Sequence, residues 1–350
     1  MQPLRIWLVG FGTVGQWLVG TLDAQAELLA DRYGVGIAVV GLANARDGFI
    51  HDGNGLDLAS VLALARDGRS IAEQPGVRCW PSAIEGLRAT EADLLVEVTA
   101  SPSNDGEPGF AHMREALQRG IPVATSNKWP LALHGVELAE LARAGGVAFR
   151  AESTVMSGTP VLSSLVDGLA GTVPTAVRGL LNATANFILT RMSGGESYAD
   201  ALAEAQRLGL AERDPSADVD GPDTVAKVMI LSALVFGRQL RPTQVTCRGI
   251  TDVARSELDR AAASGSRIKH VATLEFAGSG GTGDVVARVQ PEVVGSDDPL
   301  ARIEGTTNAV VCTASPVGEI MISGPGAGPQ LAGQGVLSDV IAIARSVRRG

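Results

Sequence analysis

Residues 209–227 (GLAERDPSADVDGPDTVAK) combine a cluster of acids with a single lysine, Lys227. The stretch 222–236 is apolar on nearly every face of a helix, which is typical of a buried helix. A buried ammonium is costly unless it is paired, and Asp223 stands four residues earlier, at the spacing that brings two helical side chains together. The pattern indicates a site for a small charged substrate. The clustered acids are Glu212, Asp214, Asp218, Asp220 and Asp223.

A purely structural interpretation of the same segment is also open. Asp220 fits the N-cap position of the helix, Pro222 fits its first turn, and Asp223 fits the positive end of its dipole. The remaining acids would then form a solvated loop. Because paired charges are often only structural, the rest of the chain has to decide between the two interpretations.

Near the N-terminus, Gly10, Gly12 and Gly15 form a G-x-G-x-x-G motif between an apolar run and a helical pattern. This is the context of dinucleotide binding, in which the pyrophosphate lies on the helix N-terminus. Glycine-rich turns of this kind also occur for packing alone, but the flanking pattern favours the nucleotide. The predicted cofactor contacts are Gly10, Phe11, Gly12, Thr13, Val14 and Gly15.

The turn after the expected second strand bears on the choice between NAD and NADP. It reads GLANAR (41–46) and has no acid before Asp47, whereas NAD sites usually place an acid there for the ribose hydroxyls. Arg46 occupies the turn, and an arginine can accept a 2′-phosphate. The sequence therefore favours NADP and leaves NAD possible; the alternative is that Arg46 is a solvent-exposed loop residue.

Composition limits the class of protein. A chain of 350 residues with 45% hydrophobic residues, 43 glycines and few aromatics predicts two domains of α/β type. A net charge of −9 without a basic tract argues against nucleic acid, and the N-terminal apolar run is too short for a membrane span. We therefore expect a soluble cytoplasmic protein. Neither the cysteines nor the histidines show metal spacing, and we expect no catalytic histidine; they are Cys79, Cys247, Cys312, His51, His112, His134 and His270.

The pattern of hydrophobic residues divides the chain into two regions. Over the first 150 residues strands alternate with helices, which predicts a Rossmann-type doubly wound sheet. The expected strands are 4–9, 36–42, 93–99 and 122–125, the expected helices are 14–30, 110–119 and 131–144, and 44–55 is expected to be a loop.

The second region, from residue 151 onward, predicts an α+β domain built on a mixed sheet. Its expected strands are 177–181, 271–276, 285–289 and 310–312, with helices at 160–169 and 335–347, a glycine-rich stretch at 324–328 and a hairpin tip at 278–283. We expect residues 1–150, completed by 324–350, to bind the dinucleotide. Residues 151–323 are then expected to be the substrate-binding domain.

Several segments together resemble one family, homoserine dehydrogenase. The segment 209–227 is the most specific of them and the glycine loop the least. The family interconverts L-homoserine and L-aspartate 4-semialdehyde with NAD(P) in threonine, methionine and isoleucine biosynthesis, and the chain resembles its short form without a C-terminal regulatory domain. The other matching segments are VGFGTVG (9–15), VEVTASPSNDGEP (96–108), TSNKWPLA (125–132), ESTVMSGTP (152–160), NATANFIL (182–189), GPGAG (324–328) and VLSD (336–339).

The resemblance implies a role for each matching residue, and a homodimer for which 151–323 is also the dimerisation domain. Lys227 matches the catalytic lysine, with Asp223 beside it and Lys128 near the nicotinamide. The implied substrate contacts are Glu212, Asp218, Asp223, Thr184 and Asn186, and the further cofactor contacts are Thr99, Lys128 and Gly328. One carboxylate and three backbone carbonyls would hold sodium, a hard cation that suits oxygen ligands; they belong to Glu152, Val155, Ser157 and Thr159.

Some positions depart from the family pattern, and two other functions stay open. The family often has glycine, threonine, tyrosine and glycine at the positions of Ala183, Ala185, Phe187 and Trp129. These changes affect fine contacts in the pocket but leave every ionisable group in place. The alternatives are a related two-domain amino-acid reductase and a non-catalytic NAD(P)-binding sensor. From the residues alone, Lys128 could also be an ordinary loop lysine and Glu152 a structural acid.

Overall fold

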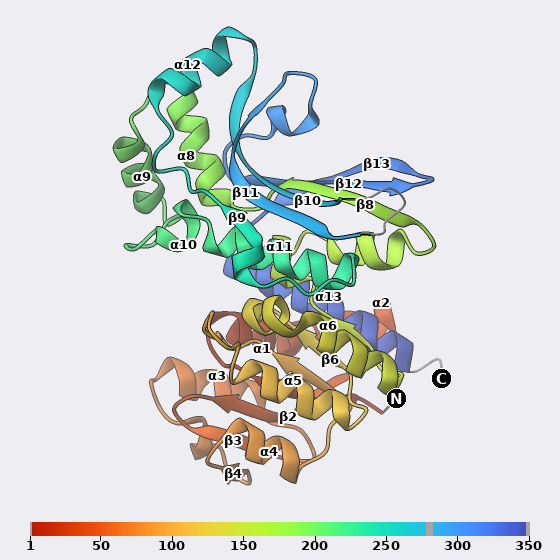
Figure 1. Cartoon of the computed structure of the whole chain (residues 1–350). Helices are drawn as coiled ribbons and strands as arrows, with labels where there is room; N and C mark the ends of the chain where they lie inside the picture. Colours follow the sequence, from red (N-terminus) through yellow and green to blue (C-terminus); the bar gives the residue numbers. More distant parts are fainter. Residues whose placement is uncertain (1, 278–282, 348–350) are drawn as a thin grey trace. The chain divides into compact units, whose positions relative to one another are not determined.

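The computed structural model describes residues 2–277 and 283–347. Its contacts divide the chain into two compact units, Met1–Gly158 with Gly328–Gly350, and Thr159–Ala327 (Figure 1). The boundaries thus lie at 158/159 and 327/328, against the 150/151 and 323/324 expected from the sequence. No helix of the described ranges is long and apolar enough to cross a membrane.

The first unit is built on a seven-stranded sheet with the order β4-β3-β2-β1-β5-β6-β7. Strands β2, β1, β5, β6 and β7 are parallel, so the predicted doubly wound sheet is confirmed. The chain order reverses on either side of β1, and ligands of such sheets bind at this switch point. The strands are β1 Leu4–Val9, β2 Ile37–Asn44, β3 Gly48–His51, β4 Arg78–Trp80, β5 Leu94–Glu97, β6 Val123–Thr125 and β7 Phe149–Arg150.

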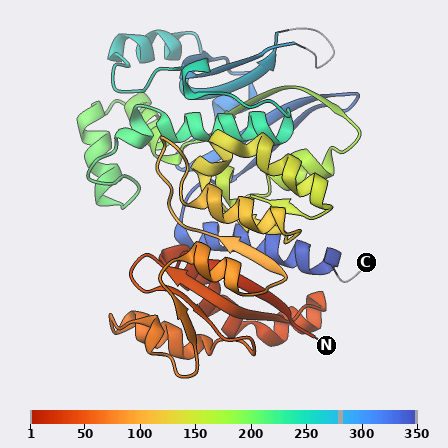
Figure 2. The ribbon, with the colours of Figure 1, turned by 60° about the horizontal axis from the view of Figure 1, so that its bottom comes forward.

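Helices cover both faces of this sheet, which is why β1 and β5 read as continuous apolar runs. The last helix, α13, returns to the first unit and packs on α1. It is the blue helix of Figure 2 that leads to the C-terminus. Gly333 of α13 is required there, because a Cβ would lie 2.1 Å from the ring of Trp17. The helices are α1 Thr13–Ala24, α2 Ala26–Tyr33, α3 Leu58–Arg66, η1 Ile71–Glu73, α4 Ala83–Ala89, α5 Gly109–Gln118, α6 Lys128–Gly145, α7 Ser153–Met156 and α13 Pro329–Val347.

Two predictions for the first unit were wrong in detail. The expected loop 44–55 contains β3, which pairs antiparallel with β2 and β4. The strand forms because Phe49 and Ile50 are fully buried and β3 has a pairing strand on each side, a tertiary effect that a loop-like composition hides. The expected helix 14–30 is two helices that meet at Gln25.

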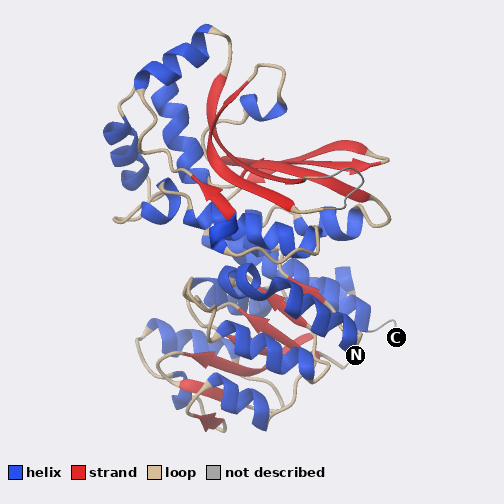
Figure 3. Cartoon of the chain, viewed as in Figure 1, coloured by secondary structure: helices blue, strands red, loops and turns tan. Residues whose placement is uncertain are grey.

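The second unit is built on a six-stranded sheet with the order β13-β12-β8-β10-β11-β9 (Figure 3). Its pairs are antiparallel except β11 with β9, so the predicted mixed sheet is confirmed. The expected hairpin tip 278–283 falls outside the described residues except for Gly283. The strands are β8 Val173–Leu180, β9 Val245–Cys247, β10 Arg267–Phe276, β11 Val285–Val294, β12 Thr307–Ser315 and β13 Gly318–Pro325.

Helix α11 packs on β10 and β11 and carries the lysine singled out from the sequence. The expected helix 160–169 is present in part as a π-helical turn, η2. Strands β9 and β13 lie outside the strands expected from the sequence. The helices are η2 Ser164–Gly168, α8 Ala183–Ser193, α9 Tyr198–Arg207, α10 Ser216–Val219, α11 Pro222–Val235, η3 Pro242–Gln244, α12 Arg255–Ala263 and η5 Pro299–Arg302.

Candidate active site

The ion pair expected on α11 is present and buried. Lys227 Nζ lies 2.8 Å from Asp223 Oδ2 and donates to the carbonyl of Leu181 at 2.6 Å. The lysine side chain is only 9% exposed. The helix is capped by Gly221 at φ 100°, not by Asp220, so that part of the structural interpretation was wrong. One face of the ammonium is thus held by a carboxylate and a carbonyl.

Asn182 joins the acids of this cluster, and the sequence interpretation missed it. Its Nδ2 donates to Asp218 Oδ1 at 2.7 Å and to Asp223 Oδ2 at 3.2 Å. Its Oδ1 accepts the backbone N–H of Ala185 at 2.9 Å, which caps α8. The available signal was an asparagine directly before a helical segment. One buried side chain therefore caps a helix and holds two carboxylates together.

The other predicted substrate residues make different contacts. Thr184 Oγ1 donates to the carbonyl of Leu210 at 2.8 Å, which ties α8 to the loop that carries Glu212. The backbone carbonyl of Glu212 accepts from Gln206 Nε2 at 3.1 Å, and the residue is exposed. The sequence grouped these residues with Lys227. In the structure Asp223 pairs with Lys227 directly, and Asn182 links Asp218 to Asp223.

Asn186 points into the fold. Its Nδ2 donates to the carbonyls of Gly305 and Thr307 at 3.0 and 3.1 Å, and its Oδ1 accepts from Lys269 Nζ at 3.3 Å. Lys269 also donates to the carbonyl of Ile303, and burial lowers its pKa to about 8. Asn186 and Lys269 thus hold the loop before β12.

In the first unit, a cavity of about 1100 Å³ surrounds the glycine loop. A Cβ on Gly10 would lie 2.6 Å from the Val98 carbonyl carbon, and one on Gly15 would lie 2.1 Å from the Gly10 oxygen. Gly12 has open space instead and offers no side chain to cap α1, so the first N–H groups of that helix face the cavity. The cradle fits a dinucleotide pyrophosphate.

Arg46 is fixed at the edge of this cavity by defined contacts. Its Nε lies 3.1 Å from Asp47 Oδ1, and its other nitrogens donate to the carbonyls of Gly68 and Arg69. Burial opposes ionisation of Asp47, but hydrogen bonds from Arg46, Asn44, Ser70 and the Ile71 N–H outweigh it and hold its pKa well below the usual range. The Arg46 side chain is still 56% exposed and lines the cavity.

The remaining predicted residues belong to the first unit, except Thr159. Thr99 lines the cavity, Lys128 is the first residue of α6, and Gly328 has a left-handed φ of 132°. The Glu152 N–H donates to Asp339 Oδ2 at 2.8 Å, and Ser157 is left-handed at φ 53°. The described residues contain no cluster of three or more His, Cys, Asp or Glu that could hold a metal ion. In the second unit, the Thr159 hydroxyl donates to the carbonyl of Pro325 at 3.0 Å.

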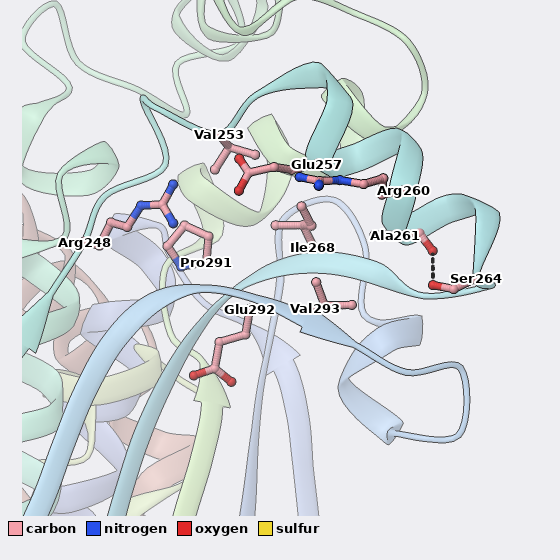
Figure 4. A pocket seen from close by; sticks show the side chains of 10 residues that line it. All are labelled: Arg248, Val253, Glu257, Arg260, Ala261, Ser264, Ile268, Pro291, Glu292 and Val293. Atoms are coloured by element: carbon pink, nitrogen blue, oxygen red, sulfur yellow. Dashed lines mark hydrogen bonds between the residues drawn. The ribbon is translucent and has the colours of Figure 1, made fainter.

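A smaller cavity of about 240 Å³ lies in the second unit, between α12 and the strands β10 and β11 (Figure 4). Arg248 and Glu257 project into it above an apolar floor that includes Ile268. Among its described lining residues there is none of the predicted site residues.

A Rossmann-type nucleotide cavity and a second unit with a buried lysine–carboxylate pair define a nicotinamide-dependent oxidoreductase. The comparison with known proteins gives the family. The model of the homoserine dehydrogenase NAD-binding domain matches residues 10–152, and the homoserine dehydrogenase model matches residues 160–341. This chain belongs to the homoserine dehydrogenase family, whose members are NAD(P)-dependent oxidoreductases acting on a CH–OH group.

Individual relatives match along their whole length. The chain is 38% identical to the NAD(+)-dependent homoserine dehydrogenase of Pseudomonas canavaninivorans, over 100% of this chain and 98% of the relative. It is 33% identical to the homoserine dehydrogenase of Methanocaldococcus jannaschii, over 99% of this chain and 100% of the relative. Its fold is similar to that of a hyperthermophilic archaeal homoserine dehydrogenase in complex with NADPH, with a TM-score of 0.81 and 29% identity over 99% and 98% of the two chains.

Proposed function

We propose that Lys227 and Asp223 act on the reacting oxygen in the interconversion of L-homoserine and L-aspartate 4-semialdehyde, together with Lys128 beside the nicotinamide. The observation that carries the proposal is the buried ion pair, with Lys227 Nζ 2.8 Å from Asp223 Oδ2. Taking a lysine ammonium out of water costs several kcal/mol unless it is paired, and Asp223 supplies the partner.

The chemistry requires an ammonium at this place. NAD(P) supplies or accepts the hydride when it is bound. Negative charge develops on the aldehyde oxygen during reduction, and the Lys227 ammonium stabilises that charge and donates a proton to the oxygen. Asp223 stabilises the positive charge of Lys227, and the Leu181 carbonyl orients the ammonium.

The acids next to Lys227 suit the amino group of the substrate. Asp218, held by Asn182, offers a carboxylate for the substrate ammonium, and the exposed Glu212 offers a second one from its loop. Thr184 supports this site by fastening that loop through the Leu210 carbonyl. For Asn186 we propose an indirect role, since its amide is occupied by the loop before β12.

For the cofactor we propose a preference for NADP with NAD also accepted. Arg46 offers an exposed guanidinium at the edge of the nucleotide cavity, held by Asp47 and two carbonyls. Its pairing with Asp47 reduces the local positive charge, which leaves room for NAD as well. Relatives of both kinds exist: one is an NAD(+)-dependent enzyme and another is in complex with NADPH.

Further proposals follow from family membership and from the sequence. Sodium is proposed at Glu152 with the backbone carbonyls of Val155, Ser157 and Thr159. A homodimer is proposed through the second unit, and the pathway is the biosynthesis of threonine, methionine and isoleucine. Three free cysteines suit a reducing compartment, and we propose a cytoplasmic location. The acidic net charge of −9 supports the proposal that nucleic acid is not a partner, and we propose no membrane partner either.

The experiment that tests the proposal follows nicotinamide absorbance with L-homoserine and either NADP or NAD. Lys227→Met, which keeps the apolar length but removes the charge, is expected to lower kcat by about 10²- to 10⁴-fold, the range for a proton-transferring group. Nucleotide binding, measured by fluorescence, is expected to stay as in the wild type. An unchanged kcat would refute the role of Lys227. Wild-type protein that binds nucleotide but never turns over homoserine would favour the sensor alternative.

A further inference from the structure

A carboxylate lies fully buried directly behind the nucleotide cavity. Glu97 is the last residue of β5, at the switch point of the sheet, and has no exposed surface. Moving a carboxylate out of water costs several kcal/mol unless it is compensated. Within the described ranges, no lysine or arginine forms a salt bridge with it. The fold thus keeps a carboxyl group that is costly to bury, and the hydrogen bonds of that group show what it holds.

The two oxygens of Glu97 hold two different loops. Oε1 accepts the hydroxyl of Thr99 and, at 3.4 Å, its backbone N–H. Oε2 accepts Nδ2 of Asn127 at 3.0 Å. Thr99 lines the nucleotide cavity, and Asn127 is the N-cap residue of α6, directly before Lys128. One carboxylate therefore fixes a cavity wall and the start of the helix that presents a proposed catalytic lysine.

The network continues to a third element. Asn127 Nδ2 also lies 2.8 Å from Ser101 Oγ, which accepts the N–H of Gly109, the first residue of α5, at 3.3 Å. A Cβ on Gly109 would lie 2.5 Å from Asn127 Nδ2, so the amide packs closely against the backbone of Gly109. Glu97 thus sets the relative positions of three segments at the carboxyl edge of the sheet.

His112 is the member of this network that is incomplete. It lies on α5, is buried, and lines the nucleotide cavity. Its Nδ1 lies 3.6 Å from Glu97 Oε1, beyond hydrogen-bond distance, and has no hydrogen-bond partner. A buried ring nitrogen without a hydrogen-bond partner destabilises the folded state. A shift of a few tenths of an ångström would complete the bond to Glu97.

We propose that Glu97 is a positioning residue for the dinucleotide and that His112 is the cavity-lining group it supports. Glu97 fixes the Thr99 hydroxyl and Asn127, and it accepts the Nδ1–H of His112 once a dinucleotide fills the cavity. The imidazole is then held against the ligand as part of the cavity wall. The inference rests on the proposed function, because it requires this cavity to bind NAD(P).

The first test exchanges the polarity of the Glu97–Asn127 contact. Glu97→Gln replaces an acceptor by a donor at this contact. The dissociation constant of this variant for NADPH, measured by fluorescence, is expected to rise about tenfold, which is the effect of losing one such hydrogen bond. Adding Asn127→Asp restores donor and acceptor in reversed order and is expected to recover most of the affinity. Glu91→Gln is the matched control, since Glu91 lies in the same unit with its side chain 74% exposed. Equal NADPH affinity of Glu97→Gln and the control would overturn the proposal.

The second test leaves the hydrogen bonds of Glu97 and Asn127 unchanged. His112→Phe keeps the ring but removes a nitrogen that has no partner in the free protein, so the unfolding temperature without nucleotide is expected not to fall. NADPH affinity is expected to drop several-fold. Wild-type affinity in this variant would overturn the role of His112, and a lower unfolding temperature with unchanged affinity would mean a structural role only. Wild-type protein that binds no nucleotide would instead refute the proposed function.

Discussion

Removing the amide of Asn182 is expected to separate helix capping from the organisation of the acidic cluster. Asn182→Ser retains an oxygen that can cap α8 but loses the Nδ2 donor to Asp218 and Asp223. Asn182→Ala loses both functions. The two variants therefore form a matched pair at one position, with the wild type as the reference.

The structure sets the magnitudes. The two lost hydrogen bonds, at 2.7 and 3.2 Å, are made to carboxylates, and a hydrogen bond to a charged group contributes about 1.5–3 kcal/mol. The shorter bond is the one to Asp218. If it keeps that carboxylate on the substrate ammonium, its loss alone is expected to lower kcat/KM by about 10- to 100-fold. The cap adds about 1 kcal/mol of stability, so Asn182→Ala is expected to be less stable than Asn182→Ser by that amount.

The assay combines steady-state kinetics for homoserine with urea unfolding. We expect both variants to lose kcat/KM to a similar extent, mainly through a higher KM, because Asp218 is proposed to bind the substrate. Only their unfolding free energies should differ. A Ser variant with wild-type kcat/KM would refute the organising role of Asn182, and equal unfolding free energies would refute its role as a cap.

Three other expectations follow from single side chains. Arg46→Ala should weaken NADP binding about tenfold more than NAD binding, because a charge-assisted contact to the 2′-phosphate is lost; equal effects in fluorescence titrations would contradict it. Glu212→Gln should raise KM for homoserine with little change in kcat, and a steady KM would exclude it as a substrate ligand. Burial lowers the pKa of His270 from 6.5 to about 4, so the unfolded chain binds more protons between these values and stability falls as pH falls through them. The loss approaches about 3 kcal/mol at pH 4 and should be absent in His270→Gln, as urea unfolding across this range would reveal.

Much of the fold could be predicted because its signals are local. Strand β1 was predicted with its observed bounds, since an apolar run before a glycine loop has few other interpretations. Strand β3 was not, because its residues form a strand only when β2 and β4 pair with it on its two sides. Strands β9 and β13 were not predicted either; they lie at the two edges of the second sheet, and most of their residues are exposed or half-buried.

The site divides in the same way. The sequence by itself determined the Lys227–Asp223 pair and the glycine loop, because both depend on spacing within one helix or one turn. Only the tertiary structure decided that Asn182 holds Asp218, 36 residues away, and that Glu97 holds Asn127, 30 residues away. The physical reason is that buried polar groups must find partners wherever the fold brings them, and strand order rather than sequence distance sets which partners are near.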